Sequence, residues 1–259
     1  MMDVSHDTVV AELARVPSLL VVCEFDGTIA EYVDNPATAR PVDGALDALA
    51  TLGSLDRTRA AVISGRSLES LRSAFGSDLE DVSSCRIELV GSGGIEIESQ
   101  MTLGLTADAR RIQRRLLQAA AQVADTHPGV TVDEKPYGVA LHVSGAAAID
   151  GQHAIERLLD FARSMPQRVY SQSRREVLDL SVLPVGQDWA IDALRQRGTA
   201  TVLYAGNDER ALASLSPGDI GCRVSAGCSG AALCLQAPAE LVQILEELSH
   251  KRARVLAMS

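Results

Sequence analysis

The feature that most constrains the fold is a continuous apolar run, Leu19–Cys23, that ends directly in the acidic turn Glu24–Thr28. A short apolar, partly β-branched run of this kind is typical of a strand buried on both faces of a sheet. Comparable runs occur at Arg59–Ile63, Arg86–Val90 and Thr199–Tyr204, with segments of helical spacing between several of them. This alternation predicts an α/β fold with a doubly wound, mostly parallel sheet.

The pattern changes in the middle of the chain. Ile95–Glu98 alternates polar and apolar residues like a half-exposed strand, and Thr106–Ala124 and Ile149–Arg163 have helical spacing around further short strands. Alternating strands with helices on one side predict a small α+β domain inserted into the first one. The predicted core domain comprises residues 1–93 and 182–259, and the predicted insert comprises residues 94–181.

The charge of the chain limits its partners. The 259 residues carry a formal net charge of −10 at pH 7, which argues against nucleic acid or an anionic membrane as the main partner. A small phosphorylated ligand stays possible, because a magnesium ion can supply positive charge locally.

The cysteines and the N-terminus predict a cytoplasmic protein. The five cysteines are odd in number and form no Cys-x-x-Cys motif, so we expect reduced, packed thiols. No basic region followed by an apolar run begins the chain, and Leu19–Cys23 is too short to cross a bilayer.

Polar groups follow three of the predicted strands at the point where each strand ends. Glu24 and Asp26 follow the first, Ser64 the second, and Asn207 with Asp208 a later one. The carboxyl ends of parallel strands meet at one edge of a sheet, so these side chains are expected to converge. Two acids can hold a divalent cation and perform acid–base work, and a hydroxyl at a helix N-terminus suits phosphate. Two simpler roles remain open: Asp26 could brace its turn, and Ser64 could cap the following helix.

This set resembles the haloacid dehalogenase superfamily, and more closely its trehalose-6-phosphate phosphatases. Glu24–Ala30, continuing to Pro41, resembles that family's opening loop, and Val62–Ser67 is similar to its second motif. Gly91–Glu96 resembles its turn into the cap domain, and Asp133–His142 its cap signature. The resemblance implies a core domain with an inserted cap.

The resemblance also implies a mechanism. The first acid attacks phosphorus, the second protonates the leaving sugar oxygen, and water then releases phosphate. Magnesium and a lysine offset the charge. The implied roles are nucleophile for Glu24; acid–base for Asp26; phosphate binding for Ser64, Gly65 and Thr28; metal binding for Glu24, Asp26, Asn207 and Asp208; and sugar binding for Asp133, Lys135, His142 and Asp179. Lys135 could instead be a surface lysine, and His142 a core histidine.

The chain departs from the family's pattern at several positions. Glu24 replaces an aspartate, and its extra methylene is expected to move the carboxylate by roughly 1 Å. Val185–Trp189 lacks the expected lysine and carries an acid instead, which predicts repulsion of phosphate. Asn207 replaces an aspartate, Gly93 a histidine, and His142–Ser144 a His-Tyr-Arg sequence.

Two functions follow from this combination. The first is magnesium-dependent hydrolysis of trehalose 6-phosphate or a related sugar phosphate. The second is a catalytically impaired pseudophosphatase that binds a sugar phosphate or a partner enzyme of disaccharide metabolism. The motif losses favour the second function, whereas the retained Asp26, Ser64 and Asp208 support the first.

Overall fold

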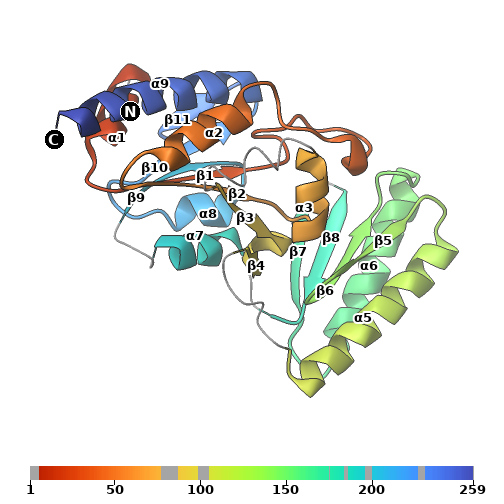
Figure 1. The fold of residues 1–259 in the computed structure, drawn as a ribbon. Helices are drawn as coiled ribbons and strands as arrows, with labels where there is room; N and C mark the ends of the chain where they lie inside the picture. Colours follow the sequence, from red (N-terminus) through yellow and green to blue (C-terminus); the bar gives the residue numbers. More distant parts are fainter. Residues whose placement is uncertain are drawn as a thin grey trace. The chain divides into compact units, whose positions relative to one another are not determined.

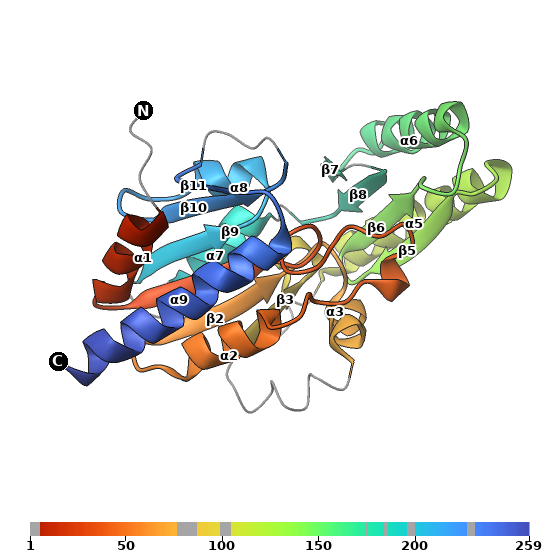
Figure 2. The same ribbon diagram turned by 90° about the horizontal axis from the view of Figure 1, so that it is seen from above.

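The computed structural model describes residues 6–76, 87–98, 105–174, 176–183, 186–195, 200–226 and 231–258. The chain divides into two compact units: a core unit, Met1–Met101 with Gly186–Ser259, and an insert unit, Thr102–Val185. Figures 1 and 2 show the elements of each.

The core unit is built on a seven-stranded sheet with the order β11-β10-β9-β1-β2-β3-β4. Every neighbouring pair is parallel except β3 and β4, which pair antiparallel. This order confirms the doubly wound, mostly parallel sheet. The strands are β1 (Leu19–Glu24), β2 (Thr58–Ile63), β3 (Ile87–Gly91), β4 (Glu96–Ile97), β9 (Thr201–Ala205), β10 (Ile220–Val224) and β11 (Leu233–Leu235).

Helices cover both faces of this sheet, which explains why β1 is apolar without interruption. Leu19, Val21 and Cys23 pack into one buried cluster, and Leu20 and Val22 pack into another on the opposite face. The first cluster is covered by α1 (His6–Arg15), α2 (Ala45–Ser54), α3 (Leu68–Phe75) and α9 (Pro238–Ala257). The second is covered by α7 (Gln187–Arg195) and α8 (Glu209–Ala213) (Figure 1).

The insert unit is a four-stranded antiparallel sheet with the order β5-β6-β8-β7. Its strands are β5 (Thr131–Lys135), β6 (Gly138–His142), β7 (Tyr170–Arg174) and β8 (Val177–Ser181). The helices α5 (Ala107–Thr126) and α6 (Ala148–Arg163) pack on one face around a separate hydrophobic cluster. An α+β insert is thus present.

One predicted assignment near the domain boundary is wrong. The sequence pattern places Ile95–Glu98 in the insert, but β4 pairs with β3 in the core sheet. The carboxylate of Glu96 accepts hydrogen bonds from the backbone N–H of Leu68, at 2.9 Å, and from the hydroxyl of Ser92, at 2.6 Å. These contacts hold the segment to the core unit.

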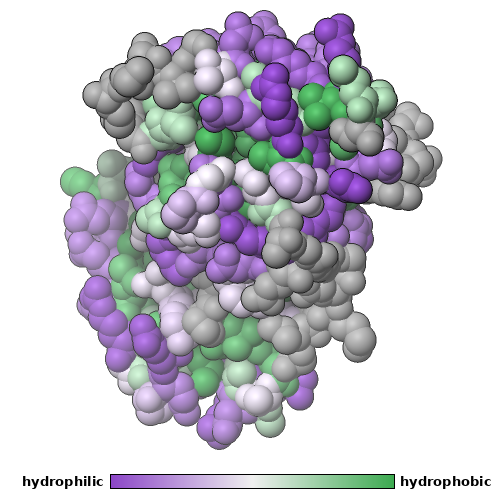
Figure 3. Space-filling model, turned by 90° about the vertical axis from the view of Figure 1, so that its left-hand side faces the viewer, coloured by the Kyte–Doolittle hydropathy of each residue, from purple (hydrophilic) through white to green (hydrophobic). Residues whose placement is uncertain are grey.

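The surface of the chain is mainly polar where Figure 3 shows it, with smaller apolar groups between hydrophilic residues. Among the helices in the described part of the chain, none combines the length and apolar composition needed to span a bilayer.

Arg252 on α9 holds several chain segments together from a fully buried position. Its guanidinium donates to the hydroxyl of Thr58 at 2.6 Å and to the carbonyl oxygens of Val16 and Arg57 at 3.0 and 2.9 Å. Buried carbonyl groups that lose a charged donor are costly to leave unpaired.

We therefore expect Arg252→Met to lower the free energy of unfolding by about 3 kcal/mol, measured by urea denaturation. Arg254→Met, the same exchange at an exposed position of α9, serves as the control and should change stability by less than about 0.5 kcal/mol. Equal effects of the two exchanges would contradict this role of Arg252.

Cys23 is completely buried in β1, and burial raises the pKa of its thiol from 9.0 to about 12. Cys23, Cys222 and Cys234 are free thiols, in agreement with the prediction for these three. Cys85 and Cys228 lie outside the described residues. The raised pKa keeps the Cys23 thiol neutral at physiological pH, so it does not compete with the carboxylates as a nucleophile.

The same burial predicts a pH dependence of stability. Above pH 9 the thiol ionises in the unfolded chain but not in the folded one, so stability is lost as pH rises toward about 12. The difference in unfolding free energy between the natural chain and Cys23→Ala should shrink over this window. Urea denaturation at a series of pH values measures it, and a constant difference would refute the prediction.

Candidate active site

The candidate site lies at the carboxyl ends of three neighbouring strands. β1 pairs with β9 through Cys23 and Ala205, and with β2 through Glu24 and Ile63. The residues that follow these strand ends therefore lie side by side. The expectation that three polar loop ends meet at one edge of the sheet is confirmed.

The loop after β1 is folded into a tight turn. The carbonyl oxygen of Phe25 accepts hydrogen bonds from the N–H groups of Thr28, Ile29 and Ala30, at 3.0–3.3 Å. Gly27 has a positive φ of 75°, and a Cβ there would lie 2.0 Å from the ring of Tyr32. Within this turn Thr28 is fully buried, and its hydroxyl has no hydrogen-bond partner.

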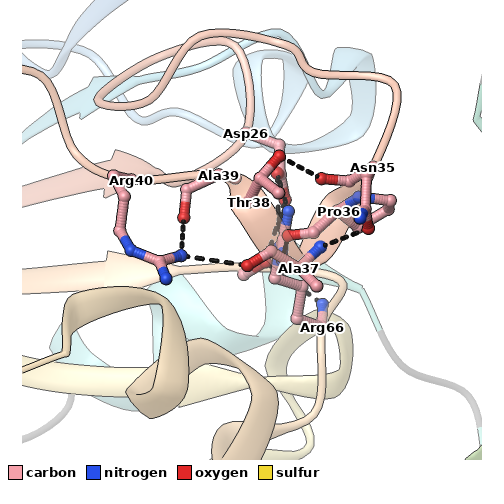
Figure 4. A network of polar contacts seen from close by, with 9 residues as sticks. Asp26, Asn35, Pro36, Ala37, Thr38, Ala39, Arg40 and Arg66 are labelled. Carbon is pink, nitrogen blue, oxygen red and sulfur yellow. Dashed lines mark hydrogen bonds and ion pairs between the residues drawn. The ribbon is translucent and has the colours of Figure 1, made fainter.

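Asp26 is held by Arg66, which lies after β2 (Figure 4). Nη2 of Arg66 donates to Oδ1 at 2.6 Å, and Nε donates to Oδ2 at 3.0 Å. A third nitrogen, Nη1, donates to the carbonyl oxygen of Pro36 at 2.6 Å, and the guanidinium lies 5.1 Å from the ring centroid of Phe25. Asp26 and Arg66 thus form a bidentate ion pair that connects the loop after β1 to the loop after β2.

Ser64 contacts the same pair. Its hydroxyl donates to Oδ2 of Asp26 at 3.4 Å and accepts from the backbone N–H of Arg66 at 3.1 Å. The alternative that Ser64 caps the next helix is wrong, because Ser67 caps α3 by accepting from the N–H of Ser70. Phosphate binding by Ser64 and Gly65 stays a prediction.

Glu24 turns in the other direction, toward β9 and α7. Its Oε1 accepts a hydrogen bond from Nε2 of Gln187, and its Oε2 accepts one from the backbone N–H of Asn207 at 2.6 Å. The hydroxyl of Tyr204 donates to Oε1 of Gln187 at 2.8 Å. The chain of contacts therefore runs from a buried tyrosine through an amide to the carboxylate.

The residue after the insert that faces this site is Gln187, and the prediction of an acid here is wrong. Gln187 is 1% exposed. The adjacent acid, Asp188, pairs instead with Nη2 of Arg210 at 2.9 Å. The expected lysine is thus replaced by a neutral donor rather than by a negative charge, and no repulsion of phosphate follows.

The described residues do not fit a magnesium ion. Oδ1 of Asp208 accepts from the N–H groups of Arg210 and Ala211, at 3.0 and 2.9 Å, and caps α8. Asn207 donates through Nδ2 to the carbonyl of Val224, although its buried Oδ1 has no partner. Within the described ranges, no three His, Cys, Asp or Glu side chains gather where they could hold one metal. Mg²⁺ is bound through one or two carboxylates with water and substrate oxygens, but the carboxylates of Glu24, Asp26 and Asp208 accept hydrogen bonds from the chain instead.

The insert unit brings the four predicted sugar-binding residues to one face of its sheet. Asp133 pairs with Ala140, which pairs with Asp179, and His142 and Lys135 lie two residues away along the same strands. Nζ of Lys135 lies 3.7 Å from Asp179 and 3.9 Å from Asp133. The helix-covered face is the opposite one, so neither simpler alternative fits: Lys135 is not a surface lysine, since it is 9% exposed, and His142 is not in the core cluster.

Sequence reasoning missed three residues of the site. Arg66 lies within the Val62–Ser67 motif, two residues after Ser64. An arginine so close to a serine that is predicted to bind phosphate could have been predicted as a site residue. Gln187 and Tyr204 have no comparable signal, because each is recognised only by the contact that it makes.

Comparisons with known proteins identify the family of this chain. The trehalose-phosphatase family model matches residues 22–178. Trehalose-phosphate phosphatase of Mycobacterium avium (strain 104) is 31% identical over 204 residues, which cover 73% of this chain and 48% of that protein. This chain therefore spans about half the length of that relative.

Two solved structures show the same fold. The C-terminal domain of Candida albicans trehalose-6-phosphate phosphatase superposes with a TM-score of 0.79 at 16% identity, covering 95% of this chain and 97% of that one. The C-terminal domain of the Candida albicans trehalose synthase regulatory protein superposes with a TM-score of 0.65 at 13% identity, covering 93% and 98%. With the family model matching more than half of its residues, this chain belongs to the trehalose-phosphatase family.

Proposed function

We propose that this chain hydrolyses trehalose 6-phosphate, or a related sugar phosphate, to the free sugar and phosphate. The observation that carries this proposal is the pair of carboxylates at the end of β1, each oriented by its own donors. Gln187 and the N–H of Asn207 hold Glu24, and Arg66 holds Asp26. Membership in the trehalose-phosphatase family supports the same substrate class.

The reaction divides into two steps. Glu24 attacks phosphorus, the bond to the sugar oxygen breaks, and Asp26 supplies the proton that this oxygen needs. Water then attacks the phosphoryl group on Glu24 while Asp26 takes up its proton, which releases phosphate and restores both acids. The guanidinium of Arg66 and the hydroxyls of Ser64 and Thr28 are the groups nearby that suit phosphate oxygens.

Magnesium is predicted from the sequence as the cofactor of an active enzyme, as is general among phosphatases of this superfamily. The described side chains do not fit it, so every step above is assigned to the chain's own residues.

A second candidate function is ligand binding without turnover. Arg66 engages both oxygens of Asp26, and a neutral amide faces Glu24 where the family pattern has a lysine. Both features weaken catalysis more than binding, because charge at the transferring group is needed chiefly in the transition state. A partner enzyme of disaccharide metabolism would suit this function.

The test is release of phosphate from trehalose 6-phosphate by the natural chain, Glu24→Asp and Glu24→Gln, each with magnesium and with a chelator. We expect turnover by the natural chain, and a loss of about a thousandfold or more in Glu24→Gln, because a carboxamide is not a nucleophile. Glu31→Gln, which changes an exposed acid in the loop after β1, is the matched control and should keep full activity.

If neither the natural chain nor Glu24→Asp releases phosphate, the hydrolase proposal fails. A thermal shift with trehalose 6-phosphate in that case would establish the binding function instead. Turnover that appears only in Glu24→Asp would identify the glutamate as the block.

A further inference from the structure

We infer that Gln187 is a positioning residue for Glu24, and that it compensates for the extra methylene of this acid. The inference rests on the proposed function for its kinetic consequence, but its structural basis is independent of turnover. Gln187 lies at the first position of α7, and Glu24 at the last position of β1, 163 residues earlier.

The orientation of the Gln187 amide is determined by Tyr204. This tyrosine is completely buried on β9, next to β1, and its hydroxyl donates to Oε1 of the amide at 2.8 Å. The amide nitrogen must therefore face Glu24. The reversed orientation would bring the amide oxygen against a carboxylate, and two acceptors repel each other.

Gly206 leaves the space that the longer acid occupies. A Cβ at this position would lie 2.7 Å from Cγ of Glu24, 2.8 Å from its Oε2 and 2.5 Å from the hydroxyl of Tyr204. The glutamate thus runs directly over the glycine backbone. Any larger residue at position 206 would displace the carboxylate.

The second oxygen of Glu24 is held by the backbone. The N–H of Asn207 donates to Oε2 at 2.6 Å. Each carboxylate oxygen therefore has a donor of its own, one from α7 and one from the end of β9. Glutamate has one more rotatable bond than aspartate, which by itself would give the carboxylate more positions. These contacts restrain it to one position.

If Gln187 only filled space, any residue of the same buried volume could replace it. If Gln187 positions Glu24, its amide N–H donor is required. Gln187→Met keeps the approximate length and removes the donor, whereas Gln187→Glu keeps the shape and places a second carboxylate against Glu24.

We expect Gln187→Met to lower kcat for trehalose 6-phosphate by about tenfold to a hundredfold, with KM changed by less than about threefold, because a displaced nucleophile affects the chemical step. Gln152→Met is the matched control, since Gln152 is an exposed glutamine that also donates to a glutamate, Glu156. It should leave both constants unchanged.

Gln187→Glu keeps the shape of the side chain but places a second carboxyl group against Glu24. Two carboxyl groups in contact repel each other or share a proton, and either effect disturbs the nucleophile, so kcat should fall at least as far as in Gln187→Met. A natural level of kcat in Gln187→Met overturns the inference.

A double-mutant cycle in thermal unfolding keeps the inference testable if the natural chain has no turnover. In the Glu24→Asp background the acid is too short to reach Gln187, so Gln187→Met should cost less stability there than in the natural background. If the stability effects are coupled in this way but no variant releases phosphate, the contact is supported and the proposed function is wrong. Additive effects would overturn the inference whatever the activity is.

Discussion

The parallel pairing of β1 between β9 and β2 is the interaction on which the rest of the structure depends. It buries β1 on both faces and sets the register in which Glu24, Ser64 and Asn207 leave the sheet. A shift by one residue would turn the apolar side chains of β1 to the opposite faces and would point Glu24 away from α7. The same pairing that forms the core therefore also assembles the site.

The core strands could be predicted because each is a short apolar run with a polar loop after it. The signal is strongest for Leu19–Cys23, where both faces are buried. β11 and α8 are only three and five residues long, too short to show periodicity. β4 has two residues, and its membership in the core sheet depends on pairing with β3 and on the contacts of Glu96, which no local pattern carries.

The site was predictable as a set of acids and hydroxyls but not as a set of contacts. Glu24, Asp26 and Ser64 follow strands, and a strand end is visible in the sequence. The partners of these residues are distant along the chain: Arg66 is 40 residues from Asp26, and Gln187 is 163 residues from Glu24. Between Gln187 and Asp188, the choice of which one faces β1 depends on where α7 begins, and a helix start is uncertain by one or two residues in sequence.

Glu24 is longer than the aspartate of the family pattern, and Gln187 is a neutral amide where that pattern has a lysine. Together these two changes keep the nucleophile oriented but remove a positive charge from the site. A hydrogen bond from Gln187 orients Glu24 and contributes about 2 kcal/mol net, as is usual for a bond to a charged group. A cation about 4 Å from a developing negative charge would contribute about 4 kcal/mol at an effective dielectric constant near 20. The contacts around Glu24 thus preserve the direction of attack but not the stabilisation of charge.

Arg66 brings positive charge to the acidic pair, and its guanidinium is already shared with Asp26. A phosphate group that enters this site has to compete with Asp26 for that guanidinium, and the outcome of this competition determines whether the site turns its ligand over or only holds it.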